Sequence, residues 1–233
     1  MRLSDIPRVS LAQQIIGSAD IRVSFSQFAE DLLLLNILSL HDRVRPKGFY
    51  IDVGAGHPVR DSNSHLLRTV YGWTGLNIDA IPDNIALFDH HAPDCQNICG
   101  VISDIEEDVT FSVLDQPGMS TADSAMLERA TKLGRTINSQ HTMRTRRLAD
   151  VIASSFQDVP PIDFLSVDVE GYDLRVLRSN DWEKYRPLIV MVEDLPMDLE
   201  RLSESPTKTY MNSIQYNLIA FGFATSFYRD RRV

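Results

Sequence analysis

Three apolar runs along the chain end at acidic residues, and they predict the buried strands of a sheet. They span residues 49–53, 162–167 and 187–192 and are rich in branched aliphatic and aromatic side chains. Such continuous apolar strands are typical of parallel sheets, whose two faces are both covered. Helical patterns lie between the runs. The alternation predicts an α/β fold with a Rossmann-like, doubly wound, mostly parallel sheet.

The remaining pattern adds helices and a side hairpin to this sheet. The leucine-rich run over 26–40 predicts a buried helix, with Ser24 or Ser26 as its N-cap and acids in its first turns. We expect strands at 75–79 and 97–102, a side hairpin strand at 109–113, a helix at 124–133 and a closing strand or hairpin at 218–228. The expected organisation is one domain over 1–233: a helical N-terminal cap (1–45) and a core (46–233) with a loop or lid around 112–145.

The end of the first strand has the pattern of a nucleotide site. Asp52 is followed by Gly54 and Gly56, which allow a sharp turn and a close approach of backbone to ligand. The next strand ends at Asp79, where an acid can bind ribose hydroxyls. Val59 stands where a dinucleotide fingerprint needs its third glycine. The order of acid and glycines favours S-adenosylmethionine over a dinucleotide.

Carboxylates follow the other two strands, at the edge where such sheets bind ligands. Asp168, Glu193 and Asp194 together could hold a hard cation such as Mg²⁺. Alternatively, Asp168 or Glu170 acts directly as a general base, or these acids stabilise neighbouring helix N-termini. His141 is the histidine candidate for the base, and an ordinary surface histidine is an equally good interpretation.

Composition limits the partners. The net charge of −9 argues against nucleic acid and anionic membranes, and the apolar run Leu32–Leu35 is too short to span a bilayer. Cys95 and Cys99 fit two reduced thiols better than a zinc site with His90 and His91. We expect a cytoplasmic protein with a small-molecule acceptor; a homodimer is left open.

Four segments together resemble the FkbM-type methyltransferases. Ser26-Gln27 with Glu30-Asp31 resembles the motif S-Q-x-x-E-D, and Ile51–Gly56 resembles I-D-V-G-A. Residues 72–75 with 78–82 resemble G-W-x-G…I-E-x-x-P, and residues 162–171 resemble I-D-F-L-x-I-D-V-E-G. Gly56 stands where the family often has Asn, and Asp79 replaces Glu. The resemblance covers about residues 24 to 194 and is weak over 112–160.

The resemblance implies transfer of a methyl group from S-adenosylmethionine to a hydroxyl, often of a sugar or polyketide. It also implies site residues. The catalytic candidates are His141, Asp168 and Glu170, and the metal candidates are Asp168, Glu193 and Asp194. The cofactor-binding candidates are Gln27, Glu30, Asp52, Gly54, Ala55, Gly56, Ser64, Asp79, Ala80, Ile102, Ser103 and Asp168. The alternatives are transfer to a nitrogen or carboxylate acceptor, or a protein that binds the cofactor without catalysis.

Overall fold

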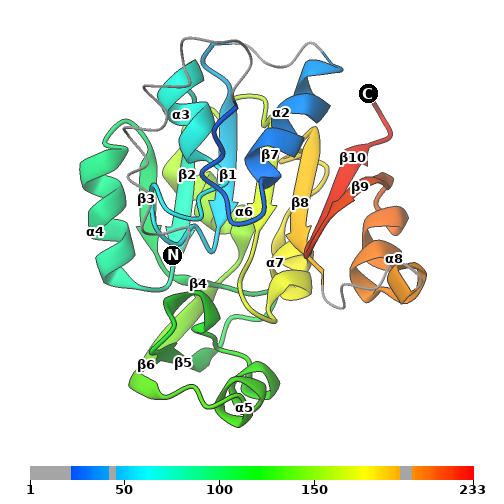
Figure 1. Ribbon diagram of the computed structural model, residues 1–233. Coiled ribbons are helices and arrows are strands. Elements are labelled where there is room, and N and C mark those ends of the chain that lie inside the picture. The colour runs from blue at the N-terminus through cyan, green and yellow to red at the C-terminus, as the bar shows by residue number, and fades with distance from the viewer. Residues whose placement is uncertain (1–21, 42–45, 195–200) are drawn as a thin grey trace.

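Seven strands form the sheet at the centre of the computed structural model, which describes residues 22–41, 46–194 and 201–233. Their order is β3-β2-β1-β7-β8-β10-β9 (Figure 1). The five strands from β3 to β8 are parallel, and β10 runs antiparallel to both neighbours. The bounds are β1 Phe49–Val53, β2 Thr74–Asp79, β3 Gln96–Cys99, β7 Phe164–Val167, β8 Ile189–Glu193, β9 Tyr216–Gly222 and β10 Thr225–Asp230.

Helices cover both faces of this sheet, which confirms the doubly wound α/β fold. One core places Tyr50 and Trp73 against apolar residues of α2 (Glu30–Ser39), α3 (His65–Tyr71) and α4 (Pro82–His91). The other places Ile51 and Val53 against α6 (Leu148–Ser155), α7 (Asp173–Ser179) and α8 (Pro206–Ser213). Alternate residues of β1 point to opposite faces, so both faces must be apolar. The strand order reverses between β1 and β7, where such folds bind ligands.

The helix in the leucine-rich run starts later than its sequence suggests. Its N-cap is Ala29 in a left-handed conformation (φ 66°), so the prediction of Ser24 or Ser26 at that position is wrong. Instead, the Asp31 carboxylate accepts hydrogen bonds from the Ser24 hydroxyl (2.5 Å), the Ser26 hydroxyl (3.0 Å) and the Phe25 N–H (2.8 Å). The acid therefore folds the preceding loop onto the helix. The rest of the expected N-terminal cap, residues 1–21 and 42–45, lies outside the described residues.

A second, three-stranded sheet replaces the predicted continuous strand 97–102 and much of the predicted loop. The chain leaves the main sheet at Gly100, whose N–H donates to the Asp79 carbonyl (3.0 Å). β4 (Val101–Ile102) then pairs with β6 (Ile137–Arg146), which pairs with β5 (Asp108–Leu114) as the expected side hairpin. The range 112–145 thus contains strand and, in α5 (Ser124–Lys132), helix. This unit lies below the main sheet in Figure 1.

The end of the chain follows the prediction, since β9 and β10 form the closing hairpin. Within the described ranges, every helix is too short or too polar to cross a membrane.

Candidate active site

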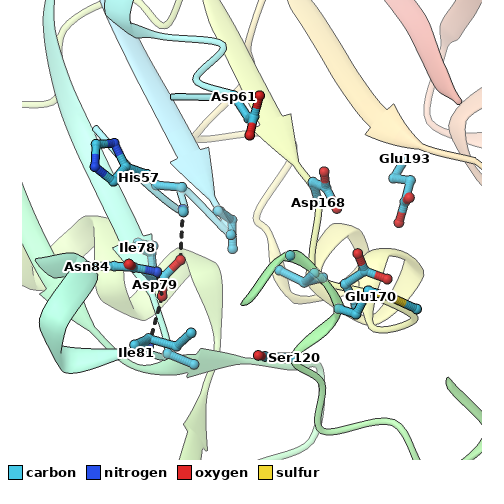
Figure 2. A pocket seen from close by; sticks show the side chains of 18 of the residues that line it. His57, Asp61, Ile78, Asp79, Ile81, Asn84, Ser120, Asp168, Glu170 and Glu193 are labelled. Carbon is cyan, nitrogen blue, oxygen red and sulfur yellow. Dashed lines mark hydrogen bonds between the residues drawn. The ribbon is translucent and has the colours of Figure 1, made fainter. Parts of the chain in front are cut away.

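A cavity of about 710 Å³ opens at the carboxyl edge of the main sheet. Its lining comes from the loop before α2, the tips of β1, β2, β7 and β8, the turn between β9 and β10, and the second sheet. Figure 2 shows Asp79, Ile81 and Asn84 on one side and Asp168, Glu170 and Glu193 on the other. The cavity therefore lies at the switch point of the sheet, where ligands are expected.

The glycine turn after β1 forms part of the cavity wall and depends on glycine for two reasons. Gly54 and Gly56 have positive φ angles (79° and 60°), which side chains rarely adopt. A Cβ on Gly54 would also overlap the carbonyl oxygen of Asp168 at the tip of β7. Only a glycine at position 54 lets the two strand tips lie this close.

Asp79 fixes the shape of this turn from the tip of β2. Its carboxylate accepts hydrogen bonds from the N–H groups of Gly56 (2.8 Å) and Ile81 (2.8 Å) and from the Asn84 side chain (3.1 Å). Burial raises the pKa of Asp79, and these three donors oppose that shift. The carboxylate faces the cavity with part of its hydrogen-bonding capacity already used within the protein.

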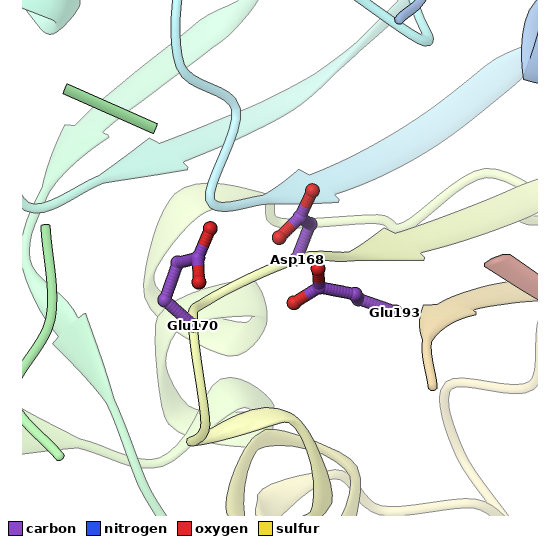
Figure 3. Close-up of side chains that lie close together, drawn as sticks. All are labelled: Asp168, Glu170 and Glu193. Atoms are coloured by element: carbon purple, nitrogen blue, oxygen red, sulfur yellow. The ribbon is translucent and has the colours of Figure 1, made fainter. Parts of the chain in front are cut away.

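Three carboxyl groups meet on one side of the cavity: Asp168, Glu170 and Glu193 (Figure 3). One oxygen of each lies within 4.8 Å of the other two. Burial, followed by the charges of nearby acids, raises the pKa of Glu170 and of Glu193 to about 8. The same causes, with Glu193 as the first neighbour, raise the pKa of Asp168, although this side chain is exposed to the cavity. The cluster therefore holds protons more tightly than ordinary carboxyl groups do.

Asp194 takes no part in this cluster, and Glu170 takes the place predicted for it. Successive residues of a strand point to opposite faces, so Asp194 turns away from Glu193. Its carboxylate is buried and accepts hydrogen bonds from Ser205 (2.9 Å), Ser226 (3.2 Å) and Tyr228 (3.4 Å). The structure therefore corrects the predicted metal set, because Asp194 holds the hairpin and α8 in place.

Several other predicted site residues lie behind or outside the cavity wall. Asp52 is buried on the side of α2 and α3, where Ser166 and Ser64 are its hydrogen-bond partners, and burial raises its pKa to about 6. Ser103, directly after β4, is fully buried. His141 is exposed on β6, hydrogen-bonded to Ser139, so its position gives no support to a role as base.

The remaining candidates are brought together as expected. The cavity lining includes Gln27, Glu30, Ala55, Ala80 and Ile102. The lining residues that the sequence analysis does not single out include two exposed aromatic side chains, Phe28 and Phe223. Phe28 occupies an x position of the S-Q-x-x-E-D motif, where the motif specifies no residue type. Phe223 lies in a turn whose place beside β8 depends on tertiary structure.

Comparison with known proteins identifies the family. A family model described as the methyltransferase FkbM domain matches residues 52–212. The chain belongs to this family. This confirms the resemblance seen in the sequence and makes the protein a member of a methyltransferase family.

Other comparisons add little to this result. None of the curated proteins matches the chain. A solved structure of an SAM-dependent methyltransferase from Geobacter sulfurreducens, in complex with S-adenosyl-L-homocysteine, is similar at 13% identity with a TM-score of 0.38. That match covers 93% of this chain and 73% of the other.

Proposed function

We propose that this FkbM-family protein is a single-domain, S-adenosylmethionine-dependent O-methyltransferase that acts on a hydroxyl of a sugar, oligosaccharide or natural product. The observation that carries the proposal is the presence, in one cavity, of a glycine turn for the cofactor and a carboxyl cluster that can accept a proton. The glycine turn would bind and orient the cofactor, and the carboxyl cluster would supply the base that an alcohol nucleophile needs.

The cofactor half of the cavity is assigned to the tips of β1 and β2. Gly54, Ala55 and Gly56 would approach the methionine part, and Asp79 would accept a hydrogen bond from a ribose hydroxyl. A carboxylate has about four lone-pair sites, and Asp79 uses three within the protein, so we assign it one bond to the ribose. Ala80 and Ile102 provide apolar surface for the adenine, and Gln27 and Glu30 cover the site.

Asp52 is assigned a supporting role in place of the direct contact expected from the sequence. It lies under the glycine turn and holds Ser166 and Ser64. We therefore treat it as a positioning residue for the β1 and β7 tips.

The reaction requires an in-line displacement at the sulfonium. The acceptor oxygen forms a bond to the methyl carbon, the carbon–sulfur bond breaks, and sulfur keeps the electron pair. The hydroxyl proton passes to a carboxylate, for which Asp168 and Glu170 are the candidates because both line the cavity. Their raised pKa values suit proton uptake near neutral pH.

A divalent cation is a second way to balance the charge of the cluster. Asp168, Glu170 and Glu193 offer three carboxylate oxygens, which suit the hard Mg²⁺ ion with water completing its shell. Bound there, Mg²⁺ would act as a Lewis acid toward the acceptor hydroxyl. Titrating Mg²⁺ at pH 8.5 tests this: a rise in melting temperature that Glu170→Gln abolishes and Asp194→Asn retains supports the site. Equal activity with and without excess chelator would reject it.

Calorimetric titration with S-adenosylhomocysteine tests the cofactor assignment, and absence of binding would overturn the proposal. Incubation of labelled S-adenosylmethionine with a panel of hydroxyl, amine and carboxylate acceptors then tests the chemistry. Label retained after treatment with base and hydroxylamine, which cleave methyl esters, and located on oxygen by mass spectrometry, supports O-methylation. Transfer only to nitrogen or carboxylate would favour the alternative acceptors, and cofactor binding without transfer to any of them would favour a non-catalytic binding protein.

A further inference from the structure

Two phenylalanines form an exposed pair in the cavity, a feature that the cofactor does not explain. The Phe28 and Phe223 rings lie 4.1 Å apart between centroids, with planes tilted by 37°. The residues are 42% and 54% exposed, and both line the cavity. Exposed aromatic groups that gather beside polar residues are typical of binding surfaces.

The backbone holds Phe28 in this position. The buried Glu30 carboxylate accepts a hydrogen bond from the Phe28 N–H at 2.7 Å. Between them, Ala29 has a φ of 66°, a left-handed conformation that is uncommon for alanine. This tight turn carries Phe28 to the cavity instead of into the helix layer.

Phe223 also has an unusual backbone conformation. It is the first of two turn residues between Gly222 and Thr225, which face each other in the hairpin. Its φ is 54°, and this position in two-residue hairpins normally carries glycine. The turn is tied to β8 by a hydrogen bond from the Asp194 N–H to the Ala224 carbonyl (2.8 Å). Strain kept at a cavity wall suggests a functional reason.

The order of strands places Phe223, and with it the Phe28 ring that contacts it, across the carboxyl cluster from the glycine turn. The glycine turn follows β1, the carboxyl cluster follows β7 and β8, and the hairpin turn follows next along the same edge. Glu193 is the register partner of Thr225, two residues after Phe223. The carboxyl cluster would therefore lie between the cofactor and a molecule bound on the aromatic pair.

The charge of the cavity limits what this molecule can be. Six acids line it, opposed by Arg60 and by His57, whose pKa is lowered by burial and then by Arg60. The acids are Glu30, Asp61, Asp79, Asp168, Glu170 and Glu193. Even without the three acids of the carboxyl cluster, whose raised pKa values favour the protonated form, Glu30, Asp61 and Asp79 outnumber Arg60, so an anionic acceptor would be repelled.

We propose that Phe28 and Phe223 form the acceptor platform, and that the acceptor is an uncharged or cationic glycoside whose ring lies on the aromatic pair. The proposal rests on the function assigned above. The C–H groups of a sugar ring carry slight positive charge and fit the negative face of an aromatic ring. The hydroxyl groups at the ring edge would then point to the carboxyl cluster, which accepts their hydrogen bonds and the proton.

Saturation-transfer NMR on the protein loaded with S-adenosylhomocysteine tests this, with methyl glycosides of neutral hexoses, hexosamines and hexuronic acids as probes. Neutral and amino glycosides should bind, and the uronic acids should bind more weakly. Phe223→Leu and Phe28→Leu should weaken glycoside binding about tenfold, the loss expected for an aromatic contact. Phe223→Gly should weaken it as well, although glycine suits this turn better. Ile219→Ala, an exposed position on β9 in the same hairpin, is the matched control and should leave binding unchanged.

Three outcomes would overturn the platform. They are no binding of any neutral or amino glycoside, equal binding of the uronic acids, or wild-type glycoside affinity in both Phe223 variants. In each, normal binding of S-adenosylhomocysteine would leave the proposed function standing, because the aromatic pair lies outside the cofactor half. Loss of S-adenosylhomocysteine binding by the wild-type protein would refute both.

Discussion

Replacing Gly54 by alanine tests the contact between the tips of β1 and β7. The new methyl group meets two obstacles in the structure. The φ of 79° is unfavourable for any residue with a Cβ, and the Cβ would overlap the carbonyl oxygen of Asp168. The overlapping atom belongs to backbone, so the strand tip itself must move.

The size of the effect follows from these two obstacles. A left-handed conformation costs an L-residue about 1–2 kcal/mol. Overpacking at a tight contact costs about 1–3 kcal/mol more. We therefore expect Gly54→Ala to lower the free energy of unfolding by about 2–5 kcal/mol. In a protein of this size each kcal/mol shifts the melting temperature by about 2–4 °C.

Two other glycines separate the cost of the positive φ from the cost of the steric overlap. Gly72 has a φ of 65° with open space around the missing Cβ, so Gly72→Ala should cost about 1–2 kcal/mol. Gly100 has neither obstacle, so Gly100→Ala should be neutral or slightly stabilising. Urea unfolding of the three variants measures each value. The reasoning fails if Gly54→Ala is no less stable than Gly72→Ala.

Three further predictions concern the acids. Asp79→Asn should lower stability by about 1–3 kcal/mol and weaken S-adenosylhomocysteine binding, because the new amide donor would oppose the Gly56 N–H; unchanged calorimetric affinity would contradict it. The folded protein raises the pKa of Glu193 from 4.5 to about 8, so it holds this proton more tightly than the unfolded chain does, and wild-type stability should fall as pH rises between those values. Glu193→Gln should make the decline in melting temperature from pH 5 to 8.5 shallower, and parallel curves would refute this. Asp194→Asn should cost about 1–3 kcal/mol in urea unfolding because the Ser205 hydroxyl loses a charged acceptor, while S-adenosylhomocysteine affinity stays unchanged.

The sequence predicts the sheet well because its signals are local. Apolar runs that end in acids mark strands whose faces are both buried, and the glycines after Asp52 mark the turn. The split at Gly100 is different, since Val101 and Ile102 are apolar and suit a further stretch of the main sheet as well as they suit a new one. Their pairing with β6, more than forty residues later, decides where they lie. A long-range partner of this kind leaves no signal in the strand itself.

The sequence indicates which residues meet at the cavity better than it indicates how their side chains are oriented. The alternation of side chains along a strand decides whether an acid faces the cavity, and a shift of one position turns the side chain to the opposite face. This is why Asp194 was assigned to the cluster although it faces away. Glu170 joins the cluster just beyond the end of β7, where its φ of 52° breaks the strand pattern. Asp52 lies on the side of Tyr50, beneath the helices, which its place beside two glycines does not reveal.

The linear arrangement along the sheet edge also has an evolutionary consequence. The two aromatic residues belong to a short loop before α2 and a two-residue turn, whereas the glycine turn and Asp79 depend on contacts among the central strands. Under the proposed function, substitutions at the aromatic positions would change acceptor preference without disturbing the cofactor half. Members of this methyltransferase family that share the arrangement would then diverge to new acceptors through very few mutations, while the glycine turn and Asp79 stay the same.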